Sequence, residues 1–142
     1  MKYFLVITMI LLLINCATKK HTQEEIESAM ARYNQAIESM DADQIILTYT
    51  EDGNLGDIAN GRDSIKKFLS RFSGFKVLSN KTKTGNIILH KDTAFQAGEY
   101  HQIDIVPPKG DTTYANGFFE AIWIWKDKEG WLLKSMKTRN AE

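Results

Sequence analysis

Apolar residues recur along this chain with two different periodicities. Over residues 22–72 they return at steps of three and four, which is the spacing of one face of an α-helix. Thr22 followed by Glu25 is a capping box that predicts the start of a first helix, and Asp41 predicts the cap of a second, shorter one. After the turn signal Asn60-Gly61, the pattern predicts a third helix. The three expected apolar stripes are Ile26, Met30, Tyr33, Ile37 and Met40, then Ile45, Ile46 and Tyr49, and then Ile65, Phe68, Leu69 and Phe72.

Beyond Gly74 the pattern is typical of β-strands: β-branched and aromatic residues occur in short segments that are separated by turn sequences. Helices followed by a run of strands predict an α+β domain, with three N-terminal helices packed on one face of a curved antiparallel sheet. The predicted strands lie near 75–79, 82–89, 93–106, 113–126 and 131–138.

The first residues have the pattern of a secretory signal: Lys2, then an apolar run from Tyr3 to Ile14, then Cys16, the only cysteine. This run is too short to span a bilayer of about 30 Å as a permanent helix. Leu13-Ile14-Asn15-Cys16 resembles the lipobox of bacterial lipoproteins, although Asn15 stands where Gly, Ala or Ser is usual. We therefore predict a signal peptide over 1–15, lipidation of Cys16, a tether over 16–21 and a domain over 22–142. The protein would then be anchored to a membrane of the bacterial cell envelope. An ordinary cleaved signal and an uncleaved anchor are the alternatives.

Charge and composition narrow the functional classes. Eighteen acidic and eighteen basic side chains balance, so no long-range field attracts nucleic acid. Three scattered histidines and one cysteine do not have the spacing of metal ligands, and no Gly-rich phosphate loop is found. We expect no metal, no cofactor and no nucleic-acid partner.

Several short motifs occur in an order that resembles a known family. Together they are similar to the SnoaL-like branch of the nuclear transport factor 2-like superfamily, over nearly all of residues 22–139. The resemblance implies a cone-shaped fold that encloses a pocket and is commonly dimeric. The superfamily contains isomerases, polyketide cyclases, dehydratases and epoxide hydrolases as well as members without catalysis, so the resemblance leaves the reaction open. The motifs are Asp41-Ala42, Tyr49-Thr50-Glu51-Asp52, Gly61-Arg62-Asp63-Ser64-Ile65, Asp92-Thr93-Ala94 with Gly98, and Trp123 with Gly130-Trp131.

Glu99 and His101 interrupt an otherwise apolar strand face and are the candidates for acid–base chemistry. They would either face the pocket or lie at the solvent or a dimer interface. Tyr100 and Gln102, on the opposite side of the strand, would line the pocket if the strand carries a bulge. Asp52 matches the acidic position that follows the family's second helix, but relatives without catalysis carry it too. Glu120 is either paired with Lys134 or Arg139, or placed in a cavity. His21 and His90 are expected to be solvated, in the tether and in a turn.

Two classes of function remain open. The first is a tethered domain that binds a small hydrophobic ligand or a protein partner, without catalysis, because a mostly aromatic cavity with few polar groups suits binding. The alternative is a SnoaL-like enzyme that acts by acid–base chemistry on a hydrophobic carbonyl compound. A homodimer through the sheet is expected, since three short helices cannot cover both apolar faces of strand 113–126. The expected ligand-binding residues are Tyr33, Tyr49, Phe68, Phe72, His101 and Trp123.

Overall fold

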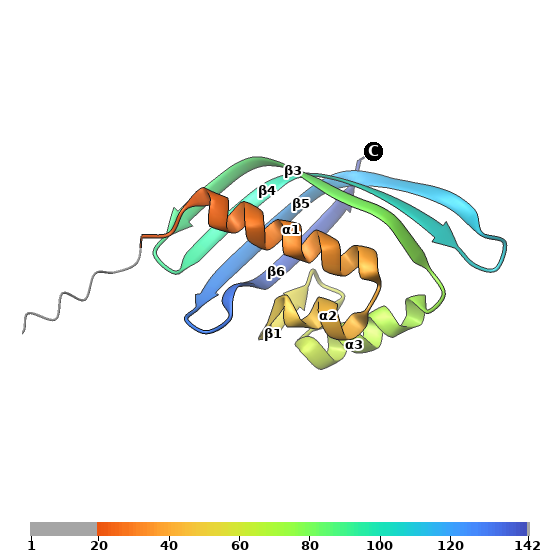
Figure 1. Cartoon of the computed structure of the whole chain (residues 1–142), viewed down its shortest axis with the longest axis horizontal. Helices are drawn as coiled ribbons and strands as arrows, with labels where there is room; N and C mark the ends of the chain where they lie inside the picture. The colour runs from red at the N-terminus through yellow and green to blue at the C-terminus, as the bar shows by residue number, and fades with distance from the viewer. Residues whose placement is uncertain (1–19, 142) are drawn as a thin grey trace, which may run out of the picture.

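The computed structural model describes residues 20–141, so the expected signal peptide, Cys16 and most of the expected tether lie outside the described residues. Helix α1 lies across a curved sheet, and the shorter helices lie below it beside β1 (Figure 1). No helix within 20–141 is long and apolar enough to cross a membrane. In chain order the elements are α1 (Gln23–Ser39), α2 (Ala42–Leu47), β1 (Tyr49–Leu55), β2 (Ala59–Asn60), α3 (Arg62–Leu69), the 3₁₀ turn η1 (Ser70–Phe72), β3 (Lys76–His90), β4 (Thr93–Val106), β5 (Asp111–Lys126) and β6 (Gly130–Asn140).

The helices begin where the capping residues predict. The Thr22 hydroxyl accepts a hydrogen bond from the Glu25 backbone N–H at 3.4 Å, and the Asp41 carboxylate accepts from the first turn of α2. Helix α1 ends at Met40, whose left-handed backbone (φ 51°) stops the helix. The expectation of three N-terminal helices is met only in part, because α2 has six residues and a β-hairpin separates it from α3.

The sheet is mixed, and this corrects the expected antiparallel sheet. Its strand order is β2-β1-β6-β5-β4-β3, and β1 runs parallel to β6 while every other pair is antiparallel. The polar segment that forms β1 carries no strand pattern in the sequence. It pairs because Gly53 allows a close approach: a Cβ there would lie 2.8 Å from the Leu133 carbonyl oxygen.

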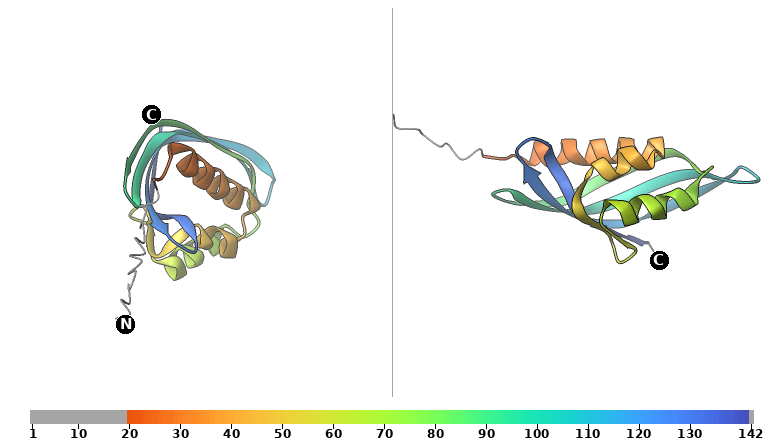
Figure 2. Two further views of the ribbon diagram at one scale, coloured as in Figure 1. Left: turned by 60° about the vertical axis from the view of Figure 1, so that its left-hand side comes forward. Right: turned by 90° about the horizontal axis from the view of Figure 1, so that it is seen from below.

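One long strand replaces the two that were predicted over 75–79 and 82–89. Strand β3 runs continuously through both segments, and its pairing with β4 shifts register between Val77 and Ser79 and between Thr84 and Asn86. Such bulges bend a strand. The sheet curls around α1, while α2 and α3 lie at its open side (Figure 2).

The core lies between α1 and the concave face of the sheet. Helix α1 buries one stripe, and β5 buries the row Phe119, Ala121 and Trp123, each 2 % exposed or less. The Trp123 indole N–H donates to the side-chain oxygen of Gln96 at 3.0 Å, so a completely buried amide fixes the largest core side chain.

Candidate functional site

A cavity of about 260 Å³ lies between α1 and the concave face of the sheet, and we call it the sheet cavity. Helix α1 supplies its roof, and strands β3 to β6 supply its floor. Apolar side chains and uncharged hydrogen-bonding groups make up its whole described lining. These residues are Tyr33, Ile37, Leu55, Asn80, Thr82, Tyr100, Gln102, Ala115, Phe119, Met136 and Thr138.

A second hollow of about 220 Å³, the η1 cavity, extends from the sheet cavity toward η1. The two cavities share Ile37 and Gln102 in their linings. Between α1, α3 and the sheet the domain therefore offers two neighbouring hollows of small-molecule size. The η1 cavity is lined by Ile37, Met40, Leu69, Phe72, Phe75, Val77, Gln102 and Asp104.

The row of β4 that faces the cavity is the more polar one, whereas the sequence pattern predicted that the opposite, more apolar row would face it. Tyr100 and Gln102 line the sheet cavity, whereas Glu99 and His101 are exposed on the outer face. The inward turn of Tyr100 and Gln102 needs no bulge between β4 and β5, because that pairing runs without a register shift. Inner polar groups are tolerated because each has a partner: the Tyr100 hydroxyl donates to Asn140 at 2.8 Å.

A small hydrogen-bond network holds the wall of the sheet cavity on β3. The Asn34 amide donates to the Thr82 hydroxyl oxygen at 2.8 Å, and the Asn80 amide donates to Asn34 at 3.1 Å. The backbone N–H of Asn80 donates to the Glu38 carboxylate at 2.7 Å. The network positions a hydroxyl and a carboxamide at the cavity without a net charge there.

The five aromatic residues predicted to line the pocket divide into three groups. Tyr33 lines the sheet cavity and Phe72 lines the η1 cavity. Tyr49 and Phe68 line neither cavity. Tyr49 is buried, 1 % exposed, and its ring packs on that of Tyr33, while the Phe68 and Phe72 ring centroids lie 5.2 Å apart. Trp123 belongs to the core under α1 and lines a separate groove instead of either cavity.

The acid–base candidates lie away from both cavities. Glu99 and His101 are exposed on the outer face, and neither lines the cavities, where the sequence had placed His101. The reason is that α1 covers the other face of β4. Asp52 is exposed and forms an ion pair with Lys134; hydrogen bonds from Lys134 and Thr50 hold the pKa of the Asp52 carboxyl below its ordinary value.

Glu120 also lies outside the cavities, exposed on the outer face opposite Lys137 of β6. It forms no ion pair with either expected partner: Lys134 pairs with Asp52, and the Arg139 guanidinium lies 5.1 Å from the Phe118 ring centroid. The outer face thus carries Glu120 as a solvated charge.

Asp104 is a cavity residue that was not predicted from the sequence. Within residues 20–141 it is the one carboxylate that lines either cavity. Both of its oxygens accept hydrogen bonds from the Gln102 amide, at 2.9 and 3.0 Å. Its place in the same strand row as Tyr100 and Gln102 was the signal available in the sequence.

Tyr33 and Tyr49 form a buried pair beside the sheet cavity. Their rings meet edge to face with centroids 6.1 Å apart. Burial raises the pKa of both phenols, and the pKa of Tyr49 lies well above its ordinary value, with the neighbouring Tyr33 as a further cause. The Tyr33 hydroxyl is therefore a neutral hydrogen-bonding group at physiological pH.

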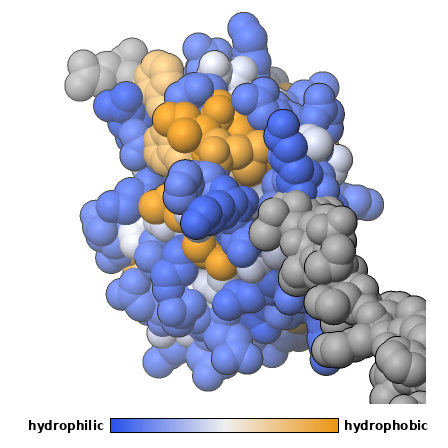
Figure 3. All heavy atoms as spheres, turned by 90° about the vertical axis from the view of Figure 1, so that its left-hand side faces the viewer, coloured by the Kyte–Doolittle hydropathy of each residue, from blue (hydrophilic) through white to orange (hydrophobic). Residues whose placement is uncertain are grey.

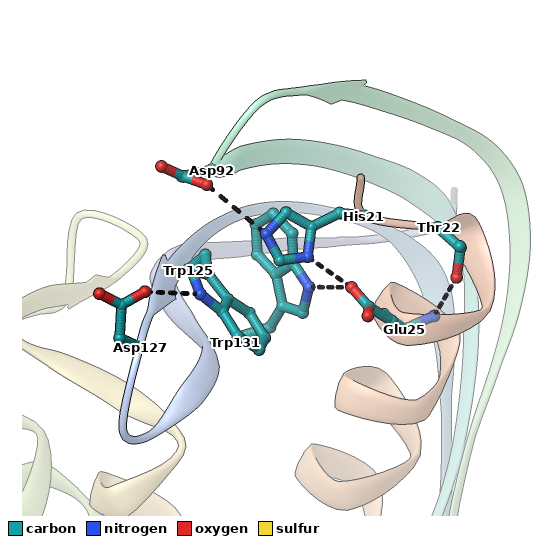
Figure 4. Close-up of polar contacts among 7 residues, drawn as sticks. All are labelled: His21, Thr22, Glu25, Asp92, Trp125, Asp127 and Trp131. Atoms are coloured by element: carbon teal, nitrogen blue, oxygen red, sulfur yellow. Dashed lines mark hydrogen bonds and ion pairs between the residues drawn. The ribbon is translucent and has the colours of Figure 1, made fainter. Parts of the chain in front are cut away.

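His21 is not solvated, contrary to the expectation for the tether. Its side chain is 3 % exposed and lies against Trp125 and Trp131, at ring-centroid distances of 4.5 and 4.8 Å (Figure 4). Its Nδ1 lies 2.6 Å from a Glu25 oxygen, and its Nε2 lies 3.5 Å from Asp92. The His21 ring therefore packs on the domain, although the sequence placed this residue in the tether.

The outer face of the sheet carries an apolar row. Ile88, Phe95 and Ile122 lie opposite one another across β3, β4 and β5. Ile88 and Ile122 are 57 % and 40 % exposed, and Phe118 farther along β5 is 43 % exposed. Figure 3, which faces the left-hand side of Figure 1, shows an area where apolar atoms reach the surface.

No protein-family model and no curated protein sequence matches this chain. Solved structures do match it, and they show the nuclear transport factor 2-like fold. A ketosteroid isomerase-like protein from Erwinia carotovora atroseptica aligns over 84 % of this chain and 95 % of its own, at 21 % identity and a TM-score of 0.73. A nuclear transport factor 2-like protein from Salmonella enterica covers 84 % and 90 %, at 16 % identity and a TM-score of 0.70. ActVI-ORFA from Streptomyces coelicolor covers 82 % and 95 %, at 15 % identity and a TM-score of 0.68.

Proposed function

We propose that this chain is a SnoaL-like binding protein of the bacterial cell envelope that holds a small, uncharged, largely apolar molecule in the sheet cavity. One observation supports this most: no charged side chain lines the described wall of the sheet cavity. A ligand without charge would lose little hydration there, and it would gain apolar contacts with residues such as Ile37 and Phe119.

The polar groups of the wall favour a ligand with one carbonyl or hydroxyl group. Gln102 and Tyr100 already have partners, whereas the Thr82 oxygen accepts from Asn34 and keeps its own proton for donation. A ligand oxygen near Thr82 would accept that hydrogen bond, and the rest of the molecule would lie on the apolar lining.

The proposal can be tested by photo-crosslinking with an uncharged alkyl ketone that carries a diazirine. We expect the label on peptides from β3 to β6 that line the sheet cavity, and little label after Ala115→Trp, which fills the cavity. Asn116→Trp is the matched control, because Asn116 is exposed on the opposite face of the same strand. Equal labelling of the two variants would contradict the proposal.

The enzymatic alternative now depends on Asp104. A carboxylate at the η1 cavity, next to the Gln102 amide, is placed where it could take a proton from a carbonyl compound in the joined cavities. One protein of similar fold carries a ketosteroid isomerase-like description. Turnover of a ketone substrate by the wild type, lost in Asp104→Asn at unchanged thermal stability, would establish this alternative over binding alone.

We further propose that a lipid on Cys16 tethers the domain to the membrane. The support is the apolar run that ends at the sole cysteine, followed within a few residues by His21, whose ring packs on the domain. Cys16→Ser should release the protein from the membrane fraction. If that variant stays membrane-bound and uncleaved, the segment is an anchor and the lipidation proposal is wrong.

We also propose that the chain forms a homodimer in which a second copy covers the apolar row on the outer face of the sheet. A second copy would bury Ile88, Phe95, Phe118 and Ile122. Charged side chains of both signs border the row, including Glu120 and Lys137, and a two-fold dimer would form each contact of the interface twice.

A further inference from the structure

A further hollow of the described domain lies outside the two cavities. It is a groove of about 490 Å³ between α1, α2 and the β5–β6 hairpin, and we call it the helix groove. Ala29, Arg32 and Ala36 of α1 line it, whereas Tyr33 and Ile37 line the sheet cavity. Because these two sets lie on different stripes of the helix, the two hollows are separate.

The floor of the helix groove is apolar. Trp123, Trp131 and Leu132 line it and are 1 %, 3 % and 6 % exposed. Leu47 stands at the rim and is 56 % exposed, although it is a large apolar side chain. An apolar body in the groove would cover Leu47 and the accessible edges of the floor.

The polar rim includes three side chains that can donate hydrogen bonds to a ligand. Within residues 20–141, the side chains of Arg32, Gln35 and Gln44 make no hydrogen bond or ion pair, and all three line the groove. The one acidic lining residue is Glu129, and its carboxylate lies 3.7 Å from the guanidinium of Arg62. Arg32 is therefore a lining cation without an ion pair among the described residues, and the one lining carboxylate lies next to a different arginine.

We propose that the helix groove binds an amphipathic monocarboxylate, such as a medium-chain fatty acid. The Arg32 guanidinium would pair with the carboxylate, for which its planar fork of donors is suited. The Gln35 and Gln44 amides supply further donors, and the acyl chain lies between Leu47 and the Trp131–Leu132 floor. This site does not depend on the proposed function, because the sheet cavity has no charged group in its described lining and favours uncharged molecules.

The test uses the full chain and two diazirine probes, photoreactive decanoic acid and its methyl ester. We expect the acid to label peptides from α1, α2 and the β5–β6 hairpin, and Arg32→Gln to reduce that labelling about tenfold, which is the loss expected for one charge-assisted hydrogen bond. Arg71→Gln, at an exposed position in η1, should leave it unchanged. Ala115→Trp should leave it unchanged as well, since it alters only the sheet cavity.

The variants also distinguish the occupants. Equal labelling by acid and ester, or no effect of Arg32→Gln, would overturn the carboxylate site. Loss of the label in Ala115→Trp would place the acid in the sheet cavity and would overturn it too. Because Arg32 is exposed, an unchanged melting temperature of Arg32→Gln shows that a loss of label reports binding and not unfolding.

Discussion

The Nδ1 atom of His21 lies 2.6 Å from Oε2 of Glu25, and the same oxygen accepts the Trp131 indole N–H at 3.1 Å. One carboxylate oxygen of α1 thus connects the segment before the helix to the last β-hairpin. Figure 4 shows His21 between these groups and Asp92, which belongs to the turn between β3 and β4. Four separate parts of the chain meet at this ring, so the histidine closes the end of the domain where the predicted tether enters.

We predict that His21→Ala lowers the free energy of unfolding by about 1–3 kcal/mol, because it removes a buried ring and a partner of a part-buried carboxylate. Chemical denaturation of the full chain measures this change. His90→Ala is the control, since His90 is exposed, and it should change stability by no more than about 0.5 kcal/mol. Equal effects of the two substitutions would show that the His21 contacts contribute nothing.

Alkaline pH should destabilise the domain through Tyr33 and Tyr49. Burial raises their pKa values in the folded state, while unfolded phenols titrate near pH 10. Above about pH 10 the unfolded chain therefore binds fewer protons than the folded one, and stability falls as the pH rises. This contribution is fully present below pH 10 and is lost as the pH passes the raised pKa values.

Phenolate absorbance measures that effect directly. The wild type and Tyr49→Phe differ by one phenol, so the difference between their phenolate absorbances reports the ionisation of Tyr49. In the folded protein this difference should appear only at a pH well above the ordinary tyrosine pKa, and in denaturant it should appear near pH 10. A difference that appears at the same pH in both states would contradict the burial of this phenol.

Ile122→Glu should convert the proposed dimer into a monomer, because it places a charge from each copy within the apolar row. Light scattering of the purified full chain gives the mass: we expect twice the monomer mass for the wild type and the monomer mass for the variant. Ile58→Glu is the control, because Ile58 is 63 % exposed and lies in the turn between β1 and β2. A wild type that is monomeric at micromolar concentration would refute the dimer.

The helices and the hairpins of this fold could be predicted because their signals are local. Thr22 and Asp41 cap helices through hydrogen bonds to residues two or three positions away, and the apolar stripe of α1 needs only its own spacing. By contrast, β1 has no such signal. Its polar segment becomes a strand because β6 lies beside it and Gly53 permits the contact, and neither fact is visible within the segment.

The site was harder to predict because the more apolar row of β4 does not face the core. Phe95 and Ile103 alternate with Gln96 and Gln102, and an apolar row normally indicates the inner face. Here the inner polar groups are satisfied by distant partners: Gln96 accepts from Trp123, 27 positions away in the chain. The apolar row faces outward instead, where we propose a second copy.

The central claim is that the sheet cavity holds a small, uncharged, largely apolar molecule. Mass spectrometry of the small molecules that co-purify with the full chain tests it most directly, when wild type, Ala115→Trp and Asn116→Trp are compared. We predict one uncharged apolar compound that is present with the wild type and with Asn116→Trp and absent from Ala115→Trp. A compound retained equally by Ala115→Trp, or a charged compound lost from it, would contradict the claim.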